Sequence, residues 1–339
     1  MKIGLLFAGQ GAQYPGMGRD LYEKSEAARK VFDEAGEQIK DWCFNGTKEM
    51  LRQTRITQPC IYTVAMAAYQ ALLESVSGWG GFFWEKAELA GLAGFSLGEY
   101  AALTAGGVIG DIGKGLEIVS ARGELMLKAG SDEEGNSKGG MVAAFGSRHE
   151  IQRCVEEARG DGILEGVNFN SQVQTAVAGD LIALERFKKT AAANKIKTIP
   201  LTVSTAFHCP MMAPAVEPMR RILLEAGLKA PTLKVYCNLT GDDILGGQRL
   251  PEGDAGRYLA DVMARQIKSP VYWQETIENM AKDGIGVLIE LGPGTTLCGM
   301  VKKISHDIVA LNVEDGESLA KTVRAMAEMT GAKGDGMDA

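Results

Sequence analysis

The sequence predicts a protein of the α/β class in which a large domain is interrupted by a smaller one. Two patterns carry this prediction. In the first, a serine flanked by glycines at residues 94–98 lies between a short apolar run and a helix of small residues. In the second, a polar break at residues 130–139 is followed by strand, helix, strand, strand, helix and strand in that order. The first pattern is typical of an α/β-hydrolase-like core, and the second is typical of a ferredoxin-like subdomain.

The large domain is expected at residues 1–138 and 204–330, with a frayed tail at 331–339. Short apolar runs predict strands, and apolar residues at helical spacing predict helices. Strands are expected at residues 2–8 and 88–94, in KVYCN and in VLIELGP. Helices are expected through most of 18–75, at 111–129, at 215–226, up to about residue 265 and at 271–283.

The inserted subdomain is expected at residues 139–203. Its predicted strands are MVAAFG, GILEGVNFN, QTAVAGD and IKTIPLTV. Its predicted helices are SRHEIQRCVEEARG and LIALERFKKTAAANK. The order βαββαβ is that of the split-βαβ, ferredoxin-like arrangement.

Composition narrows the function classes. The chain has 339 residues, of which 45% are hydrophobic and 23% charged, as is ordinary for a globular protein. A formal net charge of −7 argues against a general nucleic-acid binder, which usually carries a basic excess. No apolar run approaches the roughly 20 residues of a membrane helix, and the first run is too short for a signal peptide. The six cysteines lack metal-ligand spacing, so we expect no metal site. In a chain of this length without an export signal, we expect reduced thiols and a cytoplasmic protein.

Ser96 is the candidate nucleophile. Gly94-Phe95-Ser96-Leu97-Gly98 fits G-x-S-x-G, in which a tight strand-to-helix turn exposes the hydroxyl and leaves no room for larger side chains beside it. The backbone N–H of Leu97, at the start of the helix, would then stabilise an oxyanion. The alternative is a chance match at a structural turn, because the chain has 43 glycines. The strand before the serine and the helix after it favour the nucleophile elbow.

A serine nucleophile needs a base, and the chain has three histidines. His149 stands at a predicted helix start and His306 lies in KKISHDIV, and we expect both to face solvent. His208 lies in the loop TAFHCPMM among apolar and small residues, which makes it the candidate base. Many acids lie between Ser96 and His208 and none stands in a recognisable motif. The group that orients the histidine is therefore either an acid or a carbonyl oxygen.

A glycine-rich turn, Gly9-Gln10-Gly11-Ala12-Gln13, follows the first strand. Such a turn can cradle phosphate, but the dinucleotide spacing G-x-G-x-x-G fails because residue 14 is tyrosine. We therefore interpret the turn as the source of a second oxyanion donor, the N–H of Gln10 facing that of Leu97.

Seven sequence blocks, in order along the chain, carry a family resemblance. They span residues 5 to 300 and read FAGQGAQYPGMG, GFSLGEYAAL, SARGELM, VNFNSQVQTAVAG, TAFHCPMM, ARQIKSPVYW and LIELGPGTTLCGM. Through these blocks the chain resembles the malonyl-CoA:acyl-carrier-protein transacylases, which are related to the acyltransferase domains of polyketide and fatty acid synthases. Several unlinked motifs in one order are far more specific than any one of them.

The resemblance implies catalytic roles for the matching residues. Ser96 matches the acyl-accepting nucleophile and His208 its base, with the N–H groups of Gln10 and Leu97 as oxyanion donors. Gln266, in ARQIKSP, matches a glutamine whose main-chain carbonyl orients the histidine. That role would explain why no triad acid is apparent.

Four further residues are implied in substrate binding. Arg122 matches the arginine that holds the malonyl carboxylate, for which a planar guanidinium is well suited; a solvated helical arginine is the alternative. Phe207 matches a bulky position that disfavours an α-methyl branch, and Asn168 and Phe95 complete the group. Phe95 replaces the histidine common in the family and so alters polarity beside the nucleophile. The other departures from the family pattern are Ala8, Ala12 and Gln172.

The implied reaction is a ping-pong transfer through a malonyl-serine ester, for fatty acid or polyketide synthesis. Its substrates are malonyl-CoA and the phosphopantetheinylated acyl carrier protein. The resemblance implies no permanently bound cofactor, no nucleic acid, no membrane and a monomeric enzyme. The acidic carrier protein would meet a basic patch near the domain cleft. The candidates for that patch, which ordinary surface lysines would equally explain, are Lys188, Lys189, Lys195 and Lys197.

Two other function classes make different demands on the sequence. A serine hydrolase of the thioesterase or lipase kind would have a buried acid on His208 and no arginine at the acyl group. Arg122 and Gln266 argue against it. A non-catalytic scaffold would have lost the nucleophile or the base, and both are present.

Overall fold

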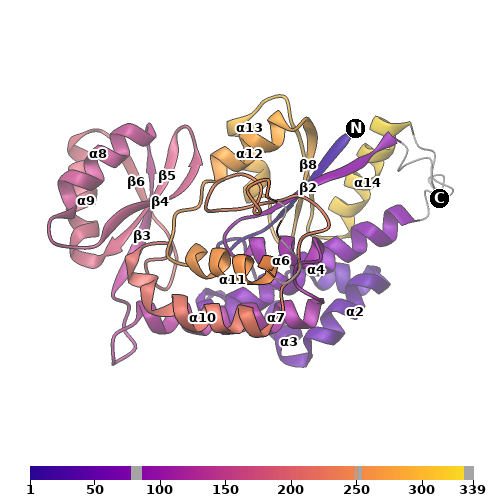
Figure 1. The fold of residues 1–339 in the computed structure, drawn as a ribbon, viewed down its shortest axis with the longest axis horizontal. Helices are drawn as coiled ribbons and strands as arrows, with labels where there is room; N and C mark the ends of the chain where they lie inside the picture. The colour runs from indigo at the N-terminus through magenta and orange to yellow at the C-terminus, as the bar shows by residue number, and fades with distance from the viewer. Residues whose placement is uncertain (78–85, 249, 251–253, 332–339) are drawn as a thin grey trace.

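The computed structural model describes residues 1–77, 86–248, 250 and 254–331. Within these residues the protein is a mixed α/β structure with two sheets (Figure 1). The larger sheet has five strands in the order β7-β2-β1-β8-β9, paired in parallel. The smaller sheet has four strands in the order β4-β5-β3-β6, paired antiparallel.

The central strands of the larger sheet are buried along most of their length, as is typical of a parallel sheet covered by helices. Phe7 pairs with Gly94 on one side and with Leu291 on the other, so three strands end level. The turns that follow them therefore share one edge of the sheet. The strands are β1 (Lys2–Phe7), β2 (Glu88–Gly94), β7 (Val235–Tyr236), β8 (Ile285–Leu291) and β9 (Val309–Val313).

Helices make up most of the rest of the larger part. No helix among the residues described is long and apolar enough to cross a membrane. The bounds of these helices are α1 (Arg19–Lys24), α2 (Glu26–Ala35), α3 (Glu37–Asn45), α4 (Thr54–Ser77), α6 (Gly98–Ala105), α7 (Ile112–Gly130), α10 (Ala213–Glu225), α11 (Asp254–Gln266), α12 (Trp273–Lys282), α13 (Thr296–Ile304) and α14 (Gly316–Thr330).

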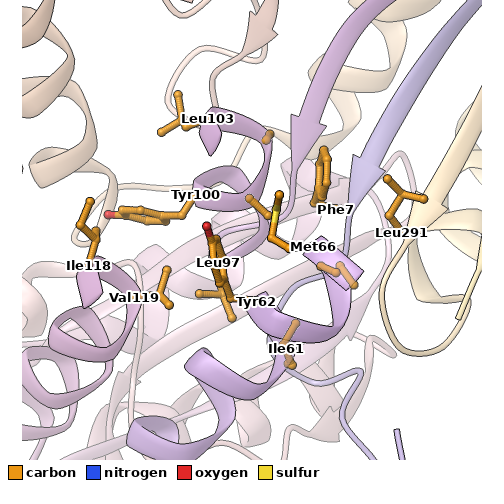
Figure 2. Packing of buried hydrophobic residues seen from close by; sticks show 14 of the residues in the cluster. Phe7, Ile61, Tyr62, Met66, Leu97, Tyr100, Leu103, Ile118, Val119 and Leu291 are labelled. Atoms are coloured by element: carbon orange, nitrogen blue, oxygen red, sulfur yellow. The ribbon is translucent and has the colours of Figure 1, made fainter. Parts of the chain in front are cut away.

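Successive residues of β1 face two hydrophobic cores, one on each face of the sheet. Leu5 and Phe7 belong to the core shared with α4, α6 and α7, whereas Leu6 belongs to the core shared with α12 and α13. Figure 2 shows Leu97 and Tyr100, at the start of α6, among side chains of α4 and α7. This packing fixes α6, and with it the turn that carries the candidate nucleophile.

The smaller sheet has its own core between the strands and helices α8 and α9. It lies at one end of the molecule, away from the N-terminus (Figure 1). Two backbone hydrogen bonds, Phe169 N–H to Val271 O at 2.9 Å and Val271 N–H to Val167 O at 2.8 Å, join β4 to the segment before α12. The elements are β3 (Gly139–Phe145), α8 (Arg148–Arg159), β4 (Leu164–Ser171), β5 (Gln174–Asp180), α9 (Leu181–Ala193) and β6 (Lys197–Pro200).

The predicted order of elements is confirmed as far as α12 and β8, with differences in length. The strand predicted in IKTIPLTV ends at Pro200. Leu201 still donates its N–H to the Met141 carbonyl, but the N–H of Val203 bonds back to Leu201 and so leaves the sheet. The strand predicted in KVYCN keeps two residues, since Asn238 turns its backbone N–H to Glu99 instead. The last three elements, α13, β9 and α14, were not predicted. Of the tail expected to fray at 331–339, residues 332–339 lie outside the described residues.

Candidate active site

The turn after β2 holds Ser96 in a strained backbone conformation. Ser96 has φ 52°, a left-handed value that costs energy in any residue with a Cβ. A Cβ added to Gly94 would lie 1.9 Å from the carbonyl carbon of Gly98, and one added to Gly98 would lie 2.1 Å from the carbonyl oxygen of Phe7. Both glycines are therefore required by the close approach of β1, β2 and α6, as G-x-S-x-G predicts.

Ser96 and His208 are in direct contact. The Ser96 Oγ lies 2.7 Å from the Nε2 of His208, and both side chains are buried. The Nδ1 of His208 lies 3.1 Å from the carbonyl oxygen of Gln266 and 3.0 Å from that of Ser269. Carbonyl oxygens only accept hydrogen bonds, so Nδ1 carries the proton and Nε2 is free to accept from the serine. Carbonyl oxygens thus occupy the position where a triad would place an acid.

The surroundings of His208 keep it neutral. Burial, together with the positive charge of Arg122, lowers the pKa of His208 to about 4, although the two carbonyl acceptors oppose the shift. A neutral imidazole with a free Nε2 can take a proton from a serine hydroxyl.

Arg122, on α7, is buried with only 1% of its surface exposed, and so is not a solvated helical arginine. Its Nη2 donates to Ser96 Oγ at 3.2 Å and to Gln266 Oε1 at 3.1 Å, and its Nη1 donates to Gln58 Oε1 at 3.0 Å. Burial lowers its pKa from the usual value. Among the residues described, no carboxylate contacts the guanidinium, and its Nε has no partner. The site therefore holds a buried cation that a ligand carboxylate would complement.

A cavity of about 70 Å³ opens onto this group. Phe207 and Phe95 form part of its apolar wall, and the Phe95 ring packs edge-on against Trp273 with centroids 5.3 Å apart. The Oδ1 of Asn168 is buried there without a partner among the described residues. The full lining is Gln10, Phe95, Ser96, Arg122, Met126, Met141, Asn168, Leu201, Val203, Phe207 and His208.

A second cavity of about 230 Å³ shares Gln10, Phe95 and Asn168 with the first. The Oδ1 of Asn170, which also lines it, is buried without a partner in the described part of the chain. Because the two cavities share lining residues, they adjoin one another, and we call them together the passage. Its lining combines apolar side chains with amide groups, as suits a chain that contains amides.

Of the two residues interpreted as oxyanion donors, Gln10 lines the cavity and Leu97 directly follows Ser96 in the chain. Gln10 follows β1, and its side chain donates to Thr54 Oγ1 at 3.2 Å, which fixes the turn. Leu97 is buried and directly precedes α6, so its backbone N–H belongs to the N-terminal end of that helix. Helix N-termini favour negative charge.

Several residues around Ser96 were missed by the sequence analysis. The Asn238 side chain accepts from the Ser96 N–H at 2.7 Å and donates to the Gly94 carbonyl at 2.7 Å, and so braces the turn from both sides. Glu99 is fully buried behind it. Asn238 is the last residue of the strand predicted in KVYCN, and a polar residue at a strand end is a usable signal. No sequence signal pointed to Gln58, which lies within α4.

Other residues considered in the sequence lie away from the site. His149 and His306 are exposed, as expected. Lys188, which pairs with Glu185, lies on α9 with Lys189, and Lys195 and Lys197 follow that helix. All six cysteines are buried and free. Among the residues described, no group of three or more His, Cys, Asp or Glu side chains could hold a metal ion.

Comparisons with known proteins agree with this geometry. A malonyl CoA-acyl carrier protein transacylase of Haemophilus influenzae is 34% identical over 323 residues, covering 93% of this chain and 96% of that protein. The solved structure of one from Clostridium perfringens has a TM-score of 0.85 at 34% identity, covering 97% of this chain and 98% of that one. A malonyl-transacylase solved in complex with a type II polyketide synthase acyl carrier protein has a TM-score of 0.83 at 30% identity, covering 96% and 100%. A family model described as acyl transferase domain matches residues 5–332. The chain belongs to the acyl transferase domain family.

Proposed function

We propose that this protein transfers the malonyl group of malonyl-CoA to the phosphopantetheine thiol of an acyl carrier protein through an ester on Ser96. The observation that carries the proposal is the contact of Ser96 Oγ with both the neutral His208 and the buried Arg122. The first neighbour activates a nucleophile, and the second binds an acyl group that ends in a carboxylate. Relatives named malonyl CoA-acyl carrier protein transacylase support the same substrates.

The first half-reaction forms the ester. His208 Nε2 takes the hydroxyl proton as Ser96 Oγ attacks the thioester carbonyl carbon, and the backbone N–H groups of Gln10 and Leu97 stabilise the oxyanion. The carbon–sulfur bond then breaks, and the proton on Nε2 passes to the departing CoA thiolate. The carbonyls of Gln266 and Ser269 keep the proton on Nδ1 throughout.

The second half-reaction reverses these roles. The phosphopantetheine thiol of the carrier protein gives its proton to His208 Nε2 and attacks the ester carbonyl. The bond between carbon and Ser96 Oγ breaks, and the serine regains the proton from the histidine. The pantetheine chain follows the passage past Asn168, whose unpartnered Oδ1 accepts from an amide N–H of the ligand. Both donors carry pantetheine, so one passage serves both half-reactions.

Selection among acyl groups rests on Arg122 and two phenylalanines. An acyl group without a carboxylate leaves the buried guanidinium unpaired, which costs about 2–5 kcal/mol. Phe207, which lines the cavity of about 70 Å³, leaves little room for an α-methyl branch. Phe95 gives the wall an apolar face where family members commonly have histidine.

The domain organisation belongs to the same proposal. We propose an α/β-hydrolase-like core at residues 1–138 and 204–330 and a ferredoxin-like subdomain at 139–203. The strand order β4-β5-β3-β6, with α8 and α9 packed on the sheet, supports the second assignment. The cytoplasmic location, the monomeric state and the lysine docking patch stay predictions.

Intact-protein mass spectrometry tests the function. Brief incubation with malonyl-CoA is expected to add one malonyl group to the wild type and none to Ser96→Ala. Addition of a phosphopantetheinylated carrier protein is expected to move that mass to the carrier. Loss of thioester with no mass on the carrier would indicate a hydrolase instead. A wild type that takes up no acyl group, with the thioester intact, would overturn the enzymatic proposal.

A further inference from the structure

Behind the nucleophile lies a carboxylate that the proposed mechanism does not use. Glu99 is in the first turn of α6 and none of its surface is exposed. Its Oε1 accepts from the backbone N–H of Asn238 at 3.0 Å, and its Oε2 accepts from the Nε2 of Gln266 at 3.0 Å. Removing a carboxyl group from water is unfavourable, and burial raises the pKa of Glu99 to about 7. A buried group of this kind calls for an explanation.

The Gln266 amide connects this carboxylate to the acyl site. Its Nε2 donates to Glu99 and to the Ser96 carbonyl at 2.7 Å, while its Oε1 accepts from Arg122 Nη2 at 3.1 Å. Because the Ser96 carbonyl only accepts, the NH2 side of the amide faces Ser96 and, with it, Glu99. The oxygen side is thereby turned to the guanidinium. All three side chains are fully buried or nearly so.

We propose that Glu99 is a positioning residue that acts through Gln266 to hold the Arg122 guanidinium beside Ser96, and so helps to select acyl groups that end in a carboxylate. This inference rests on the proposed function. Above pH 7, where its carboxyl group is mainly ionised, Glu99 also supplies negative charge that favours the protonated guanidinium in the empty site. It does so without a direct ion pair, so the face of Arg122 toward Ser96 stays available to a substrate carboxylate.

The variant Glu99→Gln tests this role. Its single side-chain oxygen cannot accept from both Asn238 and Gln266, and it carries no charge. The ratio of kcat/KM for malonyl-CoA to kcat/KM for acetyl-CoA is expected to fall about tenfold, chiefly through a higher KM for malonyl-CoA. The matched control is Glu290→Gln, which neutralises another fully buried carboxylate. Glu290 accepts from the N–H groups of Leu297 and Cys298 and lines the cavity of about 230 Å³, where it does not contact Arg122. Malonyl-CoA and acetyl-CoA carry the same pantetheine chain, so any effect there is common to both and the ratio is expected to stay within twofold of the wild type.

Two further variants separate positioning from stability. Gln266→Met interrupts the connection while keeping the backbone carbonyl that faces His208, and is expected to lower the same ratio even if Glu99→Gln does not fold. In an Arg122→Ala background, Glu99→Gln is expected to lower the ratio no further, because its effect passes through the arginine. A folded Gln266→Met with the wild-type ratio, or an undiminished effect of Glu99→Gln without Arg122, would overturn the inference. In either case wild-type malonyl transfer persists, which distinguishes this failure from failure of the proposed function.

Discussion

The Nη2 of Arg122 lies 3.2 Å from Ser96 Oγ, so the buried cation and the attacking oxygen are direct neighbours. The same guanidinium is held from behind by Gln58 and Gln266. An acyl group esterified to Ser96 therefore begins next to the arginine. A malonyl group, whose carboxylate lies two carbons beyond the ester carbonyl, can fold back onto the guanidinium.

Arg122→Ala is expected to lower kcat/KM for malonyl-CoA by about 30-fold or more. The estimate follows from a cost of about 2–5 kcal/mol for losing one partner of a buried charge pair. Acetyl-CoA, which has no carboxylate, should lose much less. Steady-state transfer to a carrier protein with both donors measures the difference. Arg221→Ala, which removes an arginine whose side chain is 72% exposed, is the control, and an equal loss for both donors would contradict the assignment.

The lowered pKa of His208 predicts an unusual pH profile for acylation. The base must be neutral to act, so activity is lost as pH falls through the pKa of the free enzyme. With a pKa of about 4 rather than the ordinary 6.5, the single-turnover rate with acetyl-CoA should change less than about twofold from the histidine's charge between pH 8 and pH 5.5. In Arg122→Ala the pKa of His208 should rise, because a positive neighbour is removed, and the rate should begin to fall at a higher pH.

The lowered pKa of His208 also makes the stability of the fold depend on pH, so unfolding at low pH must be measured separately from loss of activity. A histidine whose pKa is lower in the folded state binds fewer protons there than when unfolded. Stability from His208 is therefore full above pH 6.5 and decreases as pH falls toward 4. Circular dichroism at each pH is needed to separate unfolding from loss of the base. If the acylation rate of the folded wild type fell as pH dropped through about 6.5, the assignment of His208 as a neutral, buried base would be contradicted.

Phe207→Ala is expected to admit branched acyl groups. The ring lines a cavity of about 70 Å³ that it shares with His208, and its removal leaves space beside the α-carbon. The ratio of kcat/KM for an α-methyl-malonyl thioester to that for malonyl-CoA should rise at least tenfold. The control is Phe187→Ala, in the core of the smaller sheet. It should cost about 3–5 kcal/mol of stability without altering this ratio.

The parts of the site that the residues alone predicted are those encoded by local pattern, whereas Arg122 and Gln266 were implied only by the family resemblance. The glycines around Ser96 and the apolar and small residues of TAFHCPMM around His208 lie within a few residues of the side chains they flank. The carbonyl of Ser269 and the side chain of Asn238 act on residues 61 and 142 positions away. Contacts at that separation depend on how the sheet and helices assemble, and no periodicity reports them.

The fold prediction lacked β9 and α14, the last strand and the last helix. Apolar runs in the first 290 residues indicated most strands, because central parallel strands are buried on both faces. The edge strand β9 has one fully buried residue, Val313, among five, and so gave little signal. Helix α14 follows with a capping box from Asp315 and Ser318, a start signal that was present in the sequence but was not used.

Gly98→Ala is expected to damage the enzyme far more than a methyl group suggests. The new Cβ would lie 2.1 Å from the Phe7 carbonyl oxygen, which is backbone and cannot move aside cheaply. Relief requires α6 to shift away from β1, and Ser96 would move relative to His208. We expect a loss of about 3 kcal/mol or more in the free energy of unfolding, measured by urea denaturation, and a large drop in kcat in any folded fraction.

The matched control is Gly110→Ala, whose Cβ would meet nothing within 4 Å and which should change stability by no more than about 0.5 kcal/mol. Equal denaturation midpoints for the two variants would show that the turn tolerates a side chain, and the strained elbow would then not be what fixes the nucleophile.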